Sequence, residues 1–316
     1  MSRCRRRCSS TPRAASAAAS SSASSSISSP SAGRAALVLG MLSIAWGSIL
    51  ARLSDSPPLT VAFLRLLLAA MLIAPWGLRA VAWRSLPSLR RLPIAAGAGV
   101  LLALHFVAWV PSLARTTIAA STLMVSTQPI FSILISTVAL RERPAPRTWL
   151  AVALAFSGVL LIAAADLGSG PDHLSGDLLA LLGAVFAAAY FVCGRALRGW
   201  APFPTYLLVI NLAAALCAGG VACAAGAPLL PASRADLGWL ILMALVPHLL
   251  GHGALNWAVR RLRAYVVNLA VLGEPVLASL LALLIFHESP PPGLLPGALL
   301  VGAGVALAVA WEGRGE

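Results

Sequence analysis

The chain consists of two copies of one apolar unit. Residues 105–165 align with residues 251–311 at a constant offset of 146 and without a gap, so that Gln128-Pro129 falls on Glu274-Pro275. Earlier in each copy the offset is 144, and Trp46 aligns with Tyr190. A two-residue length difference therefore separates the two blocks. Internal repeats of apolar helices are typical of secondary transporters.

The composition places this unit in a lipid bilayer. The chain is 59% apolar and 10% charged, whereas soluble domains are about 45–50% apolar and about 25% charged. A net charge of +13 could indicate a nucleic-acid partner, but that requires basic residues clustered on one surface. Here the basic residues, all Arg, lie mainly between apolar segments. We therefore expect a lipid partner and no nucleic acid.

Ten apolar segments follow residue 34, each close to the ~20 residues that a helix needs to cross a bilayer. The predicted fold is an all-α integral membrane protein with ten transmembrane helices, arranged as repeats at residues 35–166 and 177–311. Because five is odd, the second repeat must be inverted. The predicted helices are 35–53, 59–77, 93–113, 117–140 and 148–165, then 177–197, 205–225, 237–257, 264–286 and 293–311.

Residues 1–33 contain Ser, Ala and Arg with a single Ile, so they cannot bury enough apolar area to offset their ordering entropy. We expect this tail to be disordered. Its composition also resembles an organelle transit peptide. A cytosolic basic tail would have the same composition, and so would a stretch that precedes the true start codon.

The distribution of Arg predicts the orientation. Placing both termini in the cytoplasm leaves 19 of the 23 Arg on the inner side and three on the outer side, in keeping with the excess of positive charge in cytoplasmic loops. The loop at 141–147 carries three Arg, whereas its repeat partner at 287–293 carries none. This is the pattern of an inverted repeat. We expect a multi-pass protein of the plasma (inner) membrane.

Ionisable residues deep in the predicted helices mark the candidate site, because each is costly in hydrocarbon unless it faces a cavity or a partner. They are Arg65, His105, His248, His252 and Glu274. Glu274 lies ~15 Å along its helix, near the midplane, and Gln128 lies ~16 Å along the matching helix. Each precedes a Pro, which interrupts a helix, and such breaks often line transporter cavities. A packing kink is the alternative.

The histidines and aromatic residues extend this prediction. His248 and His252 share a helical face, but a third metal ligand is missing, so we expect cavity lining or interhelical hydrogen bonds and no metal. His105 has either a proton or substrate role or a structural one. Trp46 and Tyr190 could form aromatic walls of a pocket. Gly297, Gly302 and Gly304 permit close helix contact, within the chain or between subunits.

No enzyme or cofactor site is predicted. The sequence has no nucleophile elbow, P-loop or H-E-x-x-H motif, and Glu274 has no second carboxylate at its depth. Cys4 and Cys8 lack the partner pair of a zinc site.

Together these features resemble the drug/metabolite transporter superfamily, in particular its ten-helix EamA type. The resemblance covers residues 35–311. It rests on Trp46-Gly47-Ser48, Ala62-Phe63-Leu64-Arg65, the two polar-Pro pairs, Glu142 and Glu288, and Gly158 and Gly304. It implies two inverted five-helix bundles around a central cavity, which move small metabolites or toxic compounds, often outward, by alternating access. Val209 stands where the second repeat would match Arg65, so any role of Arg65 is one-sided.

The function predicted is secondary transport, with export of amino-acid-like or drug-like metabolites. We hypothesise that Arg65 binds an anionic group, that Glu274 binds a cationic one, and that Glu274 couples export to proton entry. An Arg65–Glu274 ion pair that only holds the bundles together is the rival hypothesis. A membrane-embedded sensor or assembly protein without transport activity is the alternative function.

Overall fold

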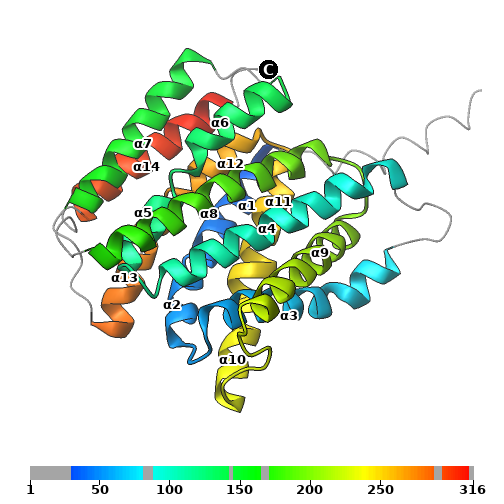
Figure 1. Ribbon diagram of the computed structural model, residues 1–316. Coiled ribbons are helices and arrows are strands. Elements are labelled where there is room, and N and C mark those ends of the chain that lie inside the picture. The colour runs from blue at the N-terminus through cyan, green and yellow to red at the C-terminus, as the bar shows by residue number, and fades with distance from the viewer. Residues whose placement is uncertain (1–29, 81–87, 142–144, 165–170, 288–293, 313–316) are drawn as a thin grey trace, which may run out of the picture.

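The computed structural model describes residues 30–80, 88–141, 145–164, 171–287 and 294–312, and its regular structure there is helical (Figure 1). The helices are α1 (Pro30–Ile44), α2 (Trp46–Leu53), α3 (Pro58–Arg79), η1 (Leu89–Arg91), α4 (Leu92–Ser112), α5 (Ile118–Val125), α6 (Gln128–Ala139), α7 (Pro146–Ala164), α8 (Pro171–Ala196), α9 (Phe203–Ala224), α10 (Arg234–Met243), η2 (Ala244–His252), α11 (Gly253–Val259), α12 (Ala264–Val271), α13 (Glu274–Phe286) and α14 (Leu294–Glu312). Residues 1–29 of the predicted tail, Glu142 and Glu288 lie outside the described residues. Residues 30–33 belong to α1.

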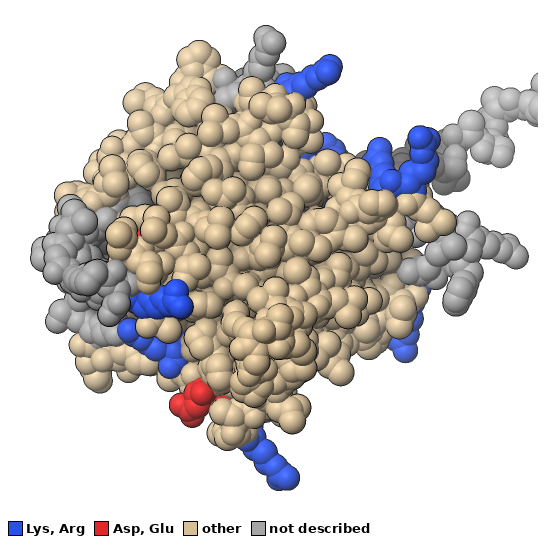
Figure 2. All heavy atoms as spheres, in the orientation of Figure 1, with Lys and Arg blue, Asp and Glu red and all other residues tan. Residues whose placement is uncertain are grey.

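Eight helical spans in the described residues are long and apolar enough to cross a membrane. The predicted fifth and tenth helices correspond to α7 and α14, which have 19 residues each. Large apolar side chains such as Val138, which is 82% exposed, cover the outside. Figure 2 shows charged side chains near the edges of the visible face and a broad uncharged area between them. This surface suits hydrocarbon, and the protein is an integral membrane protein.

Matched glycines at the crossing of α7 and α14 reveal the internal twofold symmetry. A Cβ added to Gly158 would lie 2.5 Å from the carbonyl oxygen of Gly297, and one added to Gly304 would lie 2.7 Å from that of Ala151. Each of these contacts maps onto the other by the offset of 146. Glycine is required at both positions because the two backbones touch. The close contact predicted for Gly304 is therefore formed within one chain.

The predicted fourth and ninth helices are each broken in the middle. The fourth consists of α5 and α6, the ninth of α12 and α13, and the second half of each begins at Gln128 or Glu274. Pro follows in the first turn, where its missing N–H breaks no hydrogen bond. Contacts pair α12 with α6 and α13 with α5, so the two broken helices cross near their breaks. The polar residue of each pair is thus held at the centre of the bundle.

The loops at the two ends of the bundle are tied at matched positions. At the predicted outer end, the backbone N–H of Ala232 donates to the Ser56 hydroxyl at 3.0 Å. At the predicted inner end, the Trp200 indole donates to the carbonyl of Ser88 at 3.1 Å. Ser56 matches Trp200, and Ser88 matches Ala232, by the earlier offset of 144. The symmetry of the repeats therefore extends into their loops.

The eighth predicted helix departs from α-helical geometry. Between α10 and α11 the nine residues of η2 form a π-helix around Pro247. Proline lacks the N–H for an α-helical hydrogen bond, and the wider π turn relieves its clash with the preceding turn. The segment ends at His252. The wider turn therefore sets the direction in which this side chain points, toward the bundle interior.

Candidate functional site

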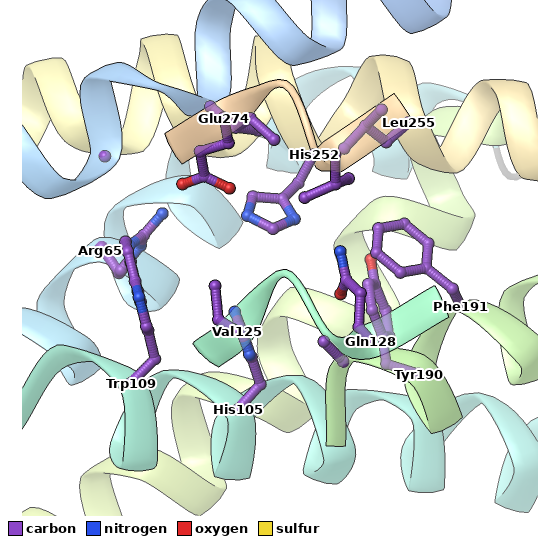
Figure 3. Close-up of a pocket in the computed structure, with 14 residues that line it drawn as sticks. Arg65, His105, Trp109, Val125, Gln128, Tyr190, Phe191, His252, Leu255 and Glu274 are labelled. Carbon is purple, nitrogen blue, oxygen red and sulfur yellow. The ribbon is translucent and has the colours of Figure 1, made fainter. Parts of the chain in front are cut away.

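A cavity lies at the centre of the bundle, where the two broken helices cross. Its volume is about 30 Å³, which is enough for one or two water molecules. Polar, charged and apolar side chains together line it (Figure 3). The polar set is Arg65, His105, Gln128, Tyr190, His252 and Glu274, and the apolar set includes Ile44, Val125, Phe191, Leu255 and Val271.

The structure brings six of the eight predicted site residues to this cavity, and they make up its polar set. His248 is buried one turn before His252 but does not line the cavity. Trp46 does not line it either, and the residue is 37% exposed. From α2, which begins at Trp46, the neighbouring residue Gly47 lines the cavity.

Arg65 lies on α3 and is 1% exposed. Its guanidinium carbon lies 3.8 Å from the centre of the Phe106 ring and 5.9 Å from that of the Trp109 ring, which gives the cation favourable contact with aromatic faces. Its Nε and Nη1 atoms are buried and have no hydrogen-bond partner in the described residues. A buried cation with unpaired donors is costly. The guanidinium is therefore available to an anionic partner.

Glu274 is the first residue of α13 and is buried. Figure 3 shows its carboxylate, the His252 imidazole and the Arg65 side chain around the same central space. The partial positive charge of a helix N-terminus favours a carboxylate at this position. No salt bridge joins Glu274 to Arg65 in the described part of the chain, so the two groups are free to contact a third partner.

The histidines pack with Phe106 and Trp109 into one cluster. His105 stacks on Trp109, with ring centroids 6.0 Å apart, and its Nδ1 lies 3.0 Å from the carbonyl oxygen of Gly183. The Nδ1–H therefore donates to this carbonyl, and in the neutral ring Nε2 carries the free lone pair. His252 meets Phe106 edge-on, with ring centroids 5.3 Å apart. Three members of this cluster, His105, Trp109 and His252, line the cavity.

His248 has a different partner. Its Nε2 lies 2.5 Å from Oδ1 of Asn211, whose amide donates to the carbonyl of Leu207 at 2.9 Å. His248 is therefore fixed behind the cavity wall. Among the described residues, no group of three or more His, Cys, Asp or Glu side chains is placed to hold a metal ion.

Asn256 is a structural partner of the site that was not predicted from the sequence. Its amide donates to the Tyr190 hydroxyl and, at 2.7 Å, to the carbonyl of His252, and its Oδ1 accepts from the Tyr206 hydroxyl at 3.0 Å. These bonds hold Tyr190 against the cavity. The sequence did contain a sign of its role. The chain has three Asn, all of them lie in predicted helices, and all are buried in the structure: Asn211, Asn256 and Asn268.

Comparison with known proteins gives the same architecture. The sequence profile of the EamA-like transporter family matches twice, at residues 31–164 and 174–310. The uncharacterized transporter YdfC of Bacillus subtilis (strain 168) is 28% identical over 276 residues, which cover 84% of this chain and 87% of YdfC. A solved crystal structure with 20% identity aligns with a TM-score of 0.69 over 89% of this chain and 98% of its own, and so shares the fold. The protein is a membrane transporter with a small-molecule substrate, and it belongs to the EamA-like transporter family.

Proposed function

We propose that this protein exports small zwitterionic, amino-acid-like metabolites across the inner membrane by alternating access. The observation that carries this proposal is the pair of opposite charges, Arg65 and Glu274, that line one central cavity, with two guanidinium nitrogens of Arg65 lacking a hydrogen-bond partner in the described residues. Ten helices in two inverted five-helix repeats are the moving parts. The protein acts as a transporter and not as an enzyme.

The chemistry of the two charges favours a substrate that carries both signs. The planar fork of Arg65 matches a carboxylate in two parallel hydrogen bonds. Glu274 can accept from an ammonium group, and the apolar residues Phe191 and Leu255 provide contact for an apolar side chain. A substrate with only one charge would leave the other protein charge buried and unpaired, at a cost in affinity.

The size of the cavity supports a closed state in the transport cycle. Small-molecule sites commonly have volumes of ~300 Å³ or more, whereas the volume of this cavity is only about 30 Å³. The substrate therefore requires the bundle to widen. The breaks before Gln128 and Glu274 provide points at which each broken helix can bend.

The energy source proposed is proton entry through Glu274. When the outward-moving substrate leaves, Glu274 takes up a proton on the outer side and releases it on the inner side. Glu274→Gln keeps the shape and cannot exchange a proton. We expect transport by this variant in proteoliposomes to lose its dependence on a pH gradient. Undiminished proton-driven transport by Glu274→Gln would exclude the coupling.

The central experiment measures transport and thermal stability together. Arg65→Gln, Glu274→Gln and the double variant are reconstituted in proteoliposomes and tested with a metabolite panel. The matched control is Arg34→Gln, which removes the same charge from an exposed site. For substrate-binding charges we expect both single cavity variants to remain folded. Arg65→Gln should lose transport, Glu274→Gln should keep at most a weak transport that no longer depends on a pH gradient, and the double variant should be inactive.

Two other outcomes have clear meanings. If both single variants lose roughly 3–5 kcal/mol of stability and the double variant regains both stability and transport, the two residues form a structural ion pair. If folded wild-type protein moves nothing in a broad panel, the transporter proposal fails and a sensor or assembly role takes its place.

The proposed orientation places both termini and the loop at 260–263 in the cytoplasm, and the loop at 287–293 outside. The asymmetry of Arg supports it. Single cysteines in these loops of a cysteine-free variant can be labelled with an impermeant thiol reagent. Labelling of the loop at 260–263 in intact cells would reverse the assignment.

A further inference from the structure

Helix α6 carries a polar stripe from the cavity toward the predicted inner end. Gln128, Ser132 and Ser136 are spaced four residues apart, hence on one face, and all three are buried. The Ser132 and Ser136 hydroxyls have no hydrogen-bond partner in the described residues. Other helical hydroxyls here bond to the carbonyl four residues earlier, as Thr137 does at 2.8 Å. Of the three hydroxyl side chains of α6, only that of Thr137 is therefore satisfied within the described residues.

A second unpaired group lies on the helix that packs against α6. Asn268 of α12 is fully buried, and neither its Nδ2 nor its Oδ1 has a partner in the described residues. It lies three residues before Val271, which lines the cavity, so both residues share a face of α12. Since α12 contacts α6, unpaired polar groups occur on both helices on the inner side of the cavity.

The twofold-related contact between α13 and α5 lacks this feature. Ala278 and Ala282 occupy the positions of Ser132 and Ser136, and Thr122 occupies that of Asn268. The Thr122 hydroxyl is satisfied by the carbonyl of Ile118 at 2.6 Å. Native proteins rarely leave buried polar groups unpaired, because each such group is destabilising. Of these two contacts, only the one between α6 and α12 has buried polar groups without a partner in the part of the chain that the structure describes. Such groups can gain partners when the helices separate.

We propose that the contact between α6 and α12 is the inner half of the substrate path. In this proposal the helices part along Ser132, Ser136 and Asn268, which then bind water and the polar groups of the passing substrate. Satisfying these groups lowers the free energy of opening on this side. The inference rests on the proposed transport through the central cavity, and it adds the route and the residues that the substrate meets.

Cysteine accessibility tests the route. In a cysteine-free parent, Ser132→Cys and Ser136→Cys are compared with the matched positions Ala278→Cys and Ala282→Cys. An impermeant thiol reagent is applied to each face of sealed vesicles, with Ser88→Cys and Arg234→Cys as references for the inner and outer faces.

We expect Ser132→Cys and Ser136→Cys to react from the face that labels Ser88→Cys, at least about tenfold faster than Ala278→Cys and Ala282→Cys do from that face, since labelling follows the population of the open state. Ser279→Cys, a near-isosteric change on α13, replaces either alanine variant that fails to fold. No labelling at 132 and 136 while Ser88→Cys reacts, or equal labelling at 278 and 282, would overturn the proposal.

A double variant tests whether the two serine hydroxyls serve the substrate path or only the packing of the helix. Ser132→Ala combined with Ser136→Ala removes both unpaired hydroxyls, so the thermal stability should hold or rise while the transport rate falls, by about fivefold for each hydroxyl. Unchanged transport by this double variant would overturn the route. If neither the wild-type protein nor the cysteine-free parent transports anything although both fold, the proposed function itself fails. Intact transport with unlabelled serine positions overturns the route alone.

Discussion

The two ends of the bundle are tied at matched positions but with different chemistry. At the predicted outer end, the Asp236 carboxylate accepts from the Ser56 hydroxyl and from the backbone N–H groups of Asp55, at 3.1 Å, and Ala232, at 3.3 Å. We call this group the outer tether. At the predicted inner end, the inner tether is the neutral bond from Trp200 to Ser88. Hydrogen bonds to a charged group are about twice as strong as neutral ones.

This difference indicates which end opens more easily. Separation at the outer end must break several bonds to a buried carboxylate. Separation at the inner tether breaks one neutral bond and allows the unpaired groups of α6 and α12 to gain partners. We therefore expect the closed state to lie closer in free energy to an inward-open state than to an outward-open one.

The largest expected effect follows from removal of the outer carboxylate. Asp236→Ala leaves several donors without their acceptor, and we expect a loss of about 2–4 kcal/mol in thermal stability. The helix start is preserved, because the Ser233 hydroxyl accepts from the backbone of residue 236 at 3.0 Å. Thiol labelling of Ala278→Cys from the outer face should then accelerate.

Asp236→Asn is the control, since it keeps an acceptor oxygen and removes the charge. It should lose less stability than Asp236→Ala. Equal losses in the two variants would show that the charge adds nothing to the outer tether, and the contrast between the two ends would disappear.

The next largest loss of stability is expected at the crossing of α7 and α14, where the two repeats make equivalent contacts. Gly158→Ala and Gly304→Ala each push a Cβ against the facing backbone, and we expect each to lose about 1–3 kcal/mol of stability. The losses should be similar because the contacts are twofold-related. Gly302→Ala, where a Cβ meets no atom within 4 Å, should lose nothing. Clearly unequal losses would mean that the scaffold is asymmetric too.

The smallest effect is expected at the inner tether. Trp200→Phe keeps an aromatic ring and removes the indole donor, so stability should fall by only about 1 kcal/mol. Labelling of Ser132→Cys from the inner face should accelerate modestly. A loss as large as that of Asp236→Ala would contradict the assignment of the inner end as the weaker one.

Much of the fold and site followed from the sequence because the bilayer restricts where polar residues can lie. Gln128 and Glu274 had to face inward, and the twofold symmetry brings matched positions together. The resemblance to EamA transporters is confirmed by the family match. The polar-Pro pairs were expected at kinks, and the structure shows full breaks at these positions.

The remaining site residues depended on geometry that periodicity does not reveal. Trp46 follows an interruption at Ala45 and begins a new helix, so its face is set by that interruption. His248 lies in the π-helix, where a four-residue spacing no longer has its α-helical meaning. Asn256 and Asn268 are uncharged, and their cost in a membrane helix is modest, so they gave a weaker signal than the ionisable residues did.

The π-helix η2 also explains how the two copies of the unit came to differ in length. Ser88 and Ala232 still match at an offset of 144, and His105 and Gly251 match at 146, so the second copy carries its two extra residues between positions 232 and 251. Within that interval, η2 makes about two turns, each of which holds about one residue more than an α-helical turn. An insertion of two residues was thus absorbed as wider turns. The helix kept its register on either side, and His252 was carried to the cavity.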